Sequence, residues 1–209
     1  MAKSRSPYDL HPSVAYLQAI LANFAARTGR SPEAWTALLM AQGPGEPTAR
    51  LAWLKAQGLG TQQAQLVLKR LAPAGPGAFD DTPEGYLAAA PGYVDSQYAG
   101  AKAALRPLFE QVLLAARGLG VDVKVCPCQT MVPFYRNHVF AEVKPFASRL
   151  DLGLALGDPA NLKDPKGLLK ETGGFAKKDR LTHKLELRSE ADLASALPWL
   201  QRAYEGDGK

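Results

Sequence analysis

Residues 121–157 constrain the fold of this chain more than any other stretch. Apolar and polar side chains alternate there over several short runs, and turn residues separate the runs. The first run, residues 121–125, places valine at every second position, and residues 139–144 and 149–154 repeat the pattern. Alternation with a period of two is typical of strands that bury one face. The stretch therefore predicts antiparallel strands with one buried face and one polar face.

Two further runs add to this sheet. Residues 130–135 are apolar and aromatic, but Pro133 lacks a backbone donor and so favours an edge or bulged strand. Residues 136–138 are typical of a hairpin turn. The segment 158–180 is long, basic and irregular, and residues 181–188 then return to strand alternation. We expect about five strands, and we expect the long segment to be functional or disordered because such loops are uncommon in compact domains.

Residues 12–72 carry the spacing of helices instead. Apolar residues recur there at steps of three and four, and glycines interrupt the stripes. Ser31, followed by proline and glutamate, is typical of a helix start. We predict four short helices with Phe24, Trp35 and Trp53 in their core.

The boundaries of the domains follow from these patterns. We expect residues 1–11 to be disordered, residues 12–72 to form the all-helical domain, and residues 98–209 to form an α+β domain whose antiparallel sheet has flanking helices. Residues 73–97, rich in proline, glycine and acids, are read as a linker. Two prolines are expected to limit helices: Pro91 with the following glycine ends any short helix after residue 83, and Pro198 breaks or kinks the last one.

Composition narrows the class of protein. The 209 residues are 46% hydrophobic and 22% charged, which is ordinary for a soluble globular chain. The sequence contains no run of about 18 apolar residues, which a membrane-spanning helix would need. No apolar stretch follows the N-terminal basic residues, as it would in a secretory signal. We therefore expect a cytoplasmic protein without a membrane partner. Cys126 and Cys128 are separated by one residue, which disfavours a disulfide between them and fits a reducing compartment.

Longer stretches resemble a bacterial family. The segments YLQAILANFAARTGRSPEAWTALL and LAWLKAQGLG resemble a small helical domain of unknown function found in many bacteria. The segments LRPLFEQV, YRNHVFAEVKP, RLDLGLAL, THKLEL and RAYE resemble a second domain of unknown function that often follows it. Relatives of the second domain are labelled predicted transport proteins, and some lie beside nuclease-like domains. The helical relatives often carry a Gly-His pair where this chain has Gln62 and Gln63, so nothing that depends on that histidine carries over.

The net charge of +5 fits either simple solubility or a polyanion partner, and one local motif makes nucleic-acid binding the first hypothesis. Residues 54–68 resemble a helix–hairpin–helix, in which two glycines let backbone N–H groups approach a phosphate. The alternative is a plain helix C-terminus followed by tight helix packing, which needs no ligand. The usual proline is Gln57 here, and no basic residue follows the second glycine. The residues assigned to nucleic-acid binding, from this turn and the basic segment, are Lys55, Gly58, Gly60, Lys69, Arg70, Lys177, Lys178 and Arg180.

The polar face of the sheet supports the second hypothesis, a site for a small anion or other small molecule. Basic side chains there offer charge-assisted hydrogen bonds, whereas the alternative is a solvated face without a ligand. The residues assigned to this site are Tyr135, Arg136, Lys144, Arg149 and His183. Because His183 falls on the apolar side of its strand, a hydrogen-bonded core histidine is the simpler interpretation.

No pattern of catalytic or metal-ligating residues stands out. The spacing of Cys126 and Cys128 with His138 and His183 matches none of the common zinc sites. Catalytic triads, phosphate loops and close carboxylate pairs are not recognisable. We therefore expect a non-enzymatic binding or accessory protein without metal or cofactor, and an enzyme is the third hypothesis. The sequence gives no indication of the oligomeric state.

Overall fold

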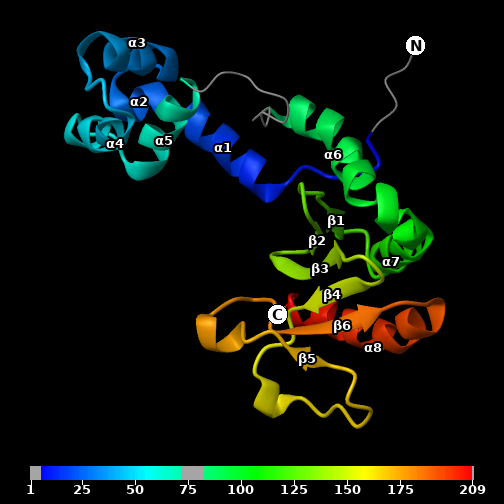
Figure 1. The fold of residues 1–209 in the computed structure, drawn as a ribbon. Helices are drawn as coiled ribbons and strands as arrows, with labels where there is room; N and C mark the ends of the chain where they lie inside the picture. The colour runs from blue at the N-terminus through cyan, green and yellow to red at the C-terminus, as the bar shows by residue number, and fades with distance from the viewer. Residues whose placement is uncertain (1–5, 72–81, 209) are drawn as a thin grey trace. The chain divides into compact units, whose positions relative to one another are not determined.

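The structure is a computed structural model that describes residues 6–71 and 82–208. It separates into two compact units, Pro12–Tyr86 and the combination of Met1–His11 with Leu87–Lys209. The chain is α+β, as the sequence predicts: helices come first, and an antiparallel sheet with flanking helices follows (Figure 1). No helix in the described residues is long and apolar enough to cross a membrane.

Over residues 12–71, the part of the helical domain that the structure describes, there are five helices where the sequence predicts four. The predicted first helix is divided at Asn23, whose side-chain amide donates to the backbone carbonyl of Ala19 at 3.0 Å. Side-chain bonds of this kind compete with the helical ladder. The five helices are α1 (Pro12–Ala22), α2 (Phe24–Thr28), α3 (Pro32–Gln42), α4 (Pro47–Ala56) and α5 (Thr61–Lys69).

The predicted helix start at Ser31 is confirmed. Its hydroxyl accepts from the backbone N–H of Ala34 at 3.2 Å, and Pro32 occupies the first helical turn of α3. Because the first N–H groups of a helix lack partners within it, this bond stabilises the helix end. Gly29, with φ of +76°, ends α2 in a left-handed conformation that glycine adopts without strain.

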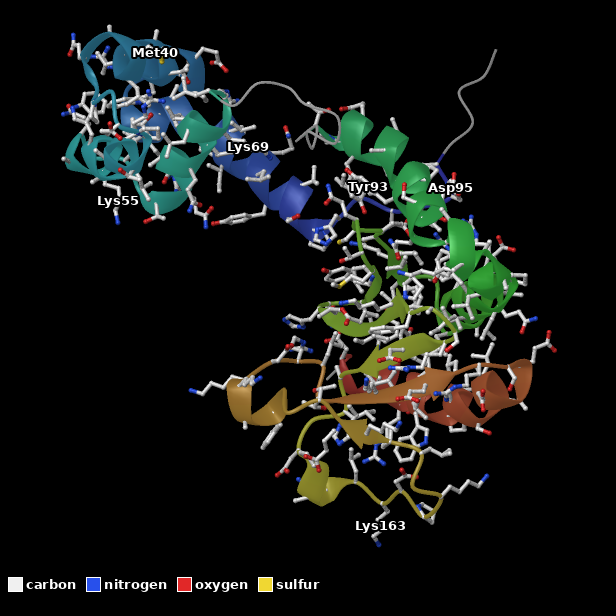
Figure 2. All side chains as sticks on the ribbon, in the orientation of Figure 1. Met40, Lys55, Lys69, Tyr93, Asp95 and Lys163 are labelled. Carbon is white, nitrogen blue, oxygen red and sulfur yellow. The ribbon has the colours of Figure 1, made fainter. Side chains whose placement is uncertain are left out.

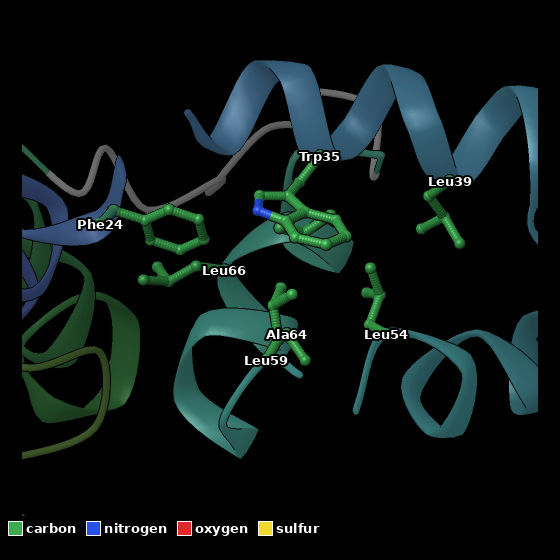
Figure 3. Close-up of a cluster of buried hydrophobic side chains, with 8 residues drawn as sticks. Phe24, Trp35, Leu39, Leu54, Leu59, Ala64 and Leu66 are labelled. Carbon is green, nitrogen blue, oxygen red and sulfur yellow. The ribbon is translucent and has the colours of Figure 1, made fainter. Parts of the chain in front are cut away.

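A cluster of apolar side chains joins these helices (Figure 3). Phe24 and Trp35 lie in it, as predicted, and the indole N–H of Trp35 donates to the Thr28 hydroxyl at 3.0 Å. Trp53 is only partly buried and packs against the edge of the cluster. The buried members are Phe24, Trp35, Leu39, Leu54, Leu59, Ala64, Leu66 and Val67.

The predicted linker is partly helical, which corrects the sequence interpretation. Helix α6 runs over Pro83–Gln97 and continues through Pro91. Tyr86, Ala90 and Val94 recur every four residues and are buried, so one face of the helix is apolar despite the proline. Residues 72–81 lie outside the described part of the chain.

The N-terminal segment also differs from its prediction. Residues 6–11 were expected to be disordered, but they lie along the first strand of the sheet. The backbone N–H of Asp9 donates to the carbonyl of Val125 at 2.8 Å, and the Asp9 carboxylate accepts from the Val125 N–H at 2.9 Å. Residues 1–5 are outside the described part.

The sheet is antiparallel, with six strands in the order β1-β2-β3-β4-β6-β5. The strand beyond the predicted five is β5, within the segment that the sequence marks as irregular. A two-residue strand shows no alternation, so the pattern could not reveal it. The strands are β1 (Lys124–Val125), β2 (Val132–Tyr135), β3 (Val139–Pro145), β4 (Leu150–Leu154), β5 (Lys170–Glu171) and β6 (His183–Leu187).

Helices cover one face of this sheet. Helix α8 (Glu190–Gly206) contacts β3, β4 and β6, and it also contacts α7 (Arg106–Gly118). The strands turn aligned apolar residues such as Val143, Leu152 and Leu185 to the buried face. Helix α8 continues through Pro198, contrary to the expected break. The ring is exposed, and the proline omits only the bond that its N–H would make to the carbonyl of Ala194.

Candidate functional site

The opposite face of the sheet carries an open cleft of about 560 Å³. Strands β2, β3, β4 and β6 form its floor, and residues 172–181 and His11 border it. A volume of this size falls in the range of small-molecule pockets, roughly 300–1,000 Å³. Successive residues of a strand point to opposite faces of the sheet. The strands that bury leucines on the helix-covered face thus place their polar side chains in this cleft.

Glu142 lies near the middle of the floor, opposite Pro133 on β2 and Gly153 on β4. A Cβ atom at position 153 would lie 3.0 Å from the Cγ of Glu142, so the glycine leaves room for the glutamate side chain. The carboxylate is half-buried and has no hydrogen-bond or ion-pair partner among the described residues. Burial raises the pKa of Glu142, and the positive charge of Lys144 partly offsets this effect.

Two lysines of the cleft have no ion-pair partner in the described residues, although the ammonium of Lys144 lies over the ring of Phe146, 5.9 Å from its centroid. Lys144, next but one to Glu142 along β3, and Lys177, from the bordering segment, form no ion pair with any described residue. Lys184 differs, because its ammonium lies 2.6 Å from the carboxylate of Asp151. Arg149 donates to the same carboxylate at 2.7 Å.

A pair of uncharged polar groups forms another part of the wall. The hydroxyl of Tyr135 and Nε2 of His11 lie 3.2 Å apart, and their rings meet edge to face. Burial raises the pKa of Tyr135 to about 12 and lowers that of His11. Both groups are therefore neutral at pH 7 and offer hydrogen bonds without a charge.

The two cysteines are free thiols. Cys126 is buried, and Cys128 lines the cleft. Burial raises the pKa of Cys128, which keeps it as the weakly nucleophilic thiol at neutral pH. Within residues 6–71 and 82–208, no three His, Cys, Asp or Glu side chains are grouped so as to hold a metal ion.

The residues assigned from the sequence to a small-ligand site are only partly brought together. Tyr135 and Lys144 line the cleft, and Arg149 lies beside it, bonded to Asp151. Arg136 is held elsewhere, since its Nε donates to Asp122 at 2.7 Å and its guanidinium stacks over the ring of Tyr204.

His183 lies on the buried face of the sheet, opposite Leu154, and its Nδ1 is 2.9 Å from the hydroxyl of Thr182. It is a hydrogen-bonded core histidine and does not line the cleft. The sequence interpretation missed Glu142 and His11. The alternation of Glu142 with Lys144 was a usable signal, whereas nothing local indicated His11.

The residues assigned to nucleic-acid binding fall into two groups in different units. In the turn, Gly58 has φ of +96° and Gly60 is the extended N-cap residue of α5, with Leu59 buried between them. Lys55 is exposed and extends away from α4 (Figure 2). Lys69 ends α5 and is exposed. Arg70 pairs with Glu33 at 3.3 Å.

The second group borders two clefts. Lys177 lines the sheet cleft, whereas Lys178 and Arg180 line a neighbouring one of about 720 Å³. Arg180 forms an ion pair with Asp207, whose side chain is only 1% exposed. The same carboxylate accepts from the backbone N–H groups of Asn137 and His138 at 3.0 and 2.8 Å. The charge of Arg180 is therefore already used within the fold.

Comparison with known proteins identifies one family. The model of a domain of unknown function (DUF5655) matches residues 94–206, which include the sheet, helices α7 and α8 and the residues that line the cleft apart from His11. No curated protein and no solved structure matches the chain. The resemblance of the second half to an uncharacterised domain is thus confirmed, while that of the helical half stays a prediction.

Proposed function

Because the chain belongs to the family of a domain of unknown function (DUF5655), we propose a function from the geometry of that domain. The protein binds a small anionic molecule over the open face of the sheet. The observation that carries this proposal is the cleft itself, in which Lys144 and Lys177 have no ion-pair partner among the described residues.

The state of these lysines supports an anionic ligand. Lys144 is half-buried, so its ammonium has lost part of its water shell without gaining a carboxylate in exchange. A carboxylate or phosphate that enters the cleft supplies that partner through charge-assisted hydrogen bonds. The neutral pair of Tyr135 and His11 adds hydrogen-bonding groups that do not repel an anion.

The cleft favours a compact ligand over a long polyanion. Glu142 and Asp179 also line it, and their negative charges would lie against a continuous phosphate backbone. A small molecule can place one anionic group at the lysines and keep it away from these carboxylates.

Backbone NMR tests this proposal on the full chain, with inorganic phosphate and succinate as probes. We expect shifts confined to residues that line the cleft, and we expect Lys144→Gln to weaken binding by about tenfold or more, since hydrogen bonds to charged groups are worth roughly 1.5–3 kcal/mol. Lys163→Gln is the control, because Lys163 is exposed in a loop outside the cleft (Figure 2). Binding that Lys144→Gln leaves unchanged would contradict the proposal.

A second candidate is weak nucleic-acid binding at the turn between α4 and α5. The observation in its favour is the backbone conformation: Gly58 is left-handed with open space beside it, and Gly60 is an N-cap residue without a side-chain cap. The side chain of Gln63 lies beside Gly60, but the N-cap position itself carries no side chain that would compete with a phosphate for the first N–H groups of α5. Duplex binding should be strongest at low salt and should fall in Gly58→Ala/Gly60→Ala and in Lys55→Gln. Absence of binding at low salt rules this candidate out.

A further inference from the structure

The acids on the open face of the sheet differ in one respect. Asp151 accepts from both Arg149 and Lys184. Glu186 lies within ion-pair distance of three cations, the nearest being Lys170 at 2.7 Å. Glu142 alone among these three acids has no partner in the described residues. Asp151 and Glu186 are therefore neutralised by neighbouring cations of the fold, whereas Glu142 is not.

An unpaired carboxylate in this position is unfavourable for the protein by itself. Glu142 is half-buried between β2 and β4, and loss of hydration without a hydrogen bond costs free energy. The neighbouring Gly153 keeps the space that this side chain occupies. A partner that arrives with the ligand accounts for both features.

The nearest cation is also placed for a ligand. Glu142 and Lys144 are two residues apart on the same side of β3, so their Cα atoms lie roughly 6–7 Å apart. They do not form an ion pair with each other within 4 Å. A negative and a positive group thus stand side by side in the cleft, each with its hydrogen-bonding capacity unused.

We propose that the cleft takes a small amphoteric molecule, whose protonated amine binds Glu142 and whose carboxylate or phosphate binds Lys144 and Lys177. Amino acids and aminoalkyl phosphates belong to this chemical class. This inference rests on the proposed function, because it assigns a ligand class to the same cleft. Glu142 then contributes selectivity, since an anion that lacks an amine leaves its carboxylate unpaired.

The same arrangement makes binding dependent on pH. Burial raises the pKa of Glu142, whereas an ammonium group at its carboxylate lowers it again. The titratable groups that face Glu142 are Lys144 and Asp179, together with the thiol of Cys128 and the phenol of Tyr135, whose pKa values its negative charge helps to raise. Because only the ionised carboxylate attracts the amine, affinity for an amphoteric ligand falls as the pH drops through the range in which Glu142 is protonated.

Isothermal titration calorimetry with matched probes tests the inference. Phosphoethanolamine is compared with ethyl phosphate, and γ-aminobutyrate with butyrate, on the full chain. We expect the amine-bearing member of each pair to bind roughly tenfold tighter or more. The preference should disappear in Glu142→Gln and persist in Glu171→Gln, a control on β5 that lies outside the cleft.

The outcomes separate the two proposals. If both members of each pair bind equally, and Glu142→Gln changes neither, the amphoteric class is wrong while anion binding stands. If no probe binds the wild-type chain, and none shifts the NMR signals of the cleft, both proposals fail. The pH dependence is a second measurement: a preference for the amine that does not weaken in acid overturns the role of Glu142.

Discussion

Glu142 lies directly opposite Gly153 in the pairing of β3 with β4, and the glycine has no Cβ where the glutamate Cγ passes. The side chain of Glu142 on β3 therefore occupies space that a side chain at position 153 on β4 would otherwise fill. The absence of a side chain at position 153 leaves room for the glutamate side chain in the cleft.

Gly153→Ala should therefore change the cleft more than the fold. The new methyl carbon would lie 3.0 Å from the Glu142 Cγ, so the glutamate must shift by a few tenths of an ångström. We expect the free energy of unfolding to change by less than about 1.5 kcal/mol, the usual range for surface and small steric changes, while ligand affinity falls. Urea unfolding and calorimetry measure the two quantities. Gly92→Ala, which has open space around it, is the control and should affect neither adversely.

Glu142→Gln should alter the pH dependence of stability. The pKa of Glu142 is raised by burial, so the folded state binds a proton more tightly than the unfolded state does. The stability that this protonation provides is complete below the unfolded pKa and is lost as the pH rises through the folded pKa. Glutamine does not titrate, so the variant does not lose this contribution to stability as the pH rises. Its stability relative to wild type should increase from pH 4 to pH 7 in urea titrations, and a constant difference would contradict the assignment.

Asp207→Ala should destabilise the second unit strongly. The side chain is almost fully buried and accepts from the backbone N–H groups of Asn137 and His138 as well as from Arg180. Its removal leaves the two backbone N–H groups and the guanidinium of Arg180 without their acceptor, which costs about 2–5 kcal/mol. Chemical unfolding followed by circular dichroism gives the value. Glu205→Ala, an exposed neighbour in α8, should change stability by only about 0.5 kcal/mol.

Leu54→Ala should destabilise the helical unit. Leu54 is fully buried in the cluster between α3, α4 and α5, and truncation of such a leucine costs about 2–5 kcal/mol (Figure 3). Met40, at 64% exposure on α3, offers a matched control. Met40→Ala should shift the thermal midpoint very little, and an equal shift in both variants would mean that burial does not decide stability here.

Local chemistry explains which parts of the fold the sequence predicts. The start of α3 depends on Ser31 and Pro32, which act within one helical turn, and the longer strands follow from the alternation of apolar and polar residues, which β5 lacks. The sequence allows a short helix up to residue 90, but the continuation of α6 to Gln97 was not predicted because Pro91 argues locally against it. The buried residues spaced four apart argue for the longer helix. The burial of this apolar stripe therefore outweighs the local effect of the proline, which a rule about proline alone does not capture.

The candidate cleft was predictable only where its residues belong to the sheet. The alternation of β3 places Lys144 on the polar face together with Glu142, and Tyr135 follows from the neighbouring strand. His11 is 124 residues away from Tyr135 in the chain, and the sequence around it resembles a flexible end. Contacts over such distances depend on the fold as a whole, so they leave no local pattern.

The two edges of the sheet have a consequence for solubility. Both outer strands, β1 and β5, pair over only two residues, and each presents an exposed lysine, Lys124 and Lys170. An edge this short gives another chain almost no backbone ladder to extend, and a charge on it opposes close approach. Edge-to-edge pairing of two copies is therefore disfavoured at both edges, and at β1 residues 6–11 add to this because Asp9 already bonds to the backbone of Val125.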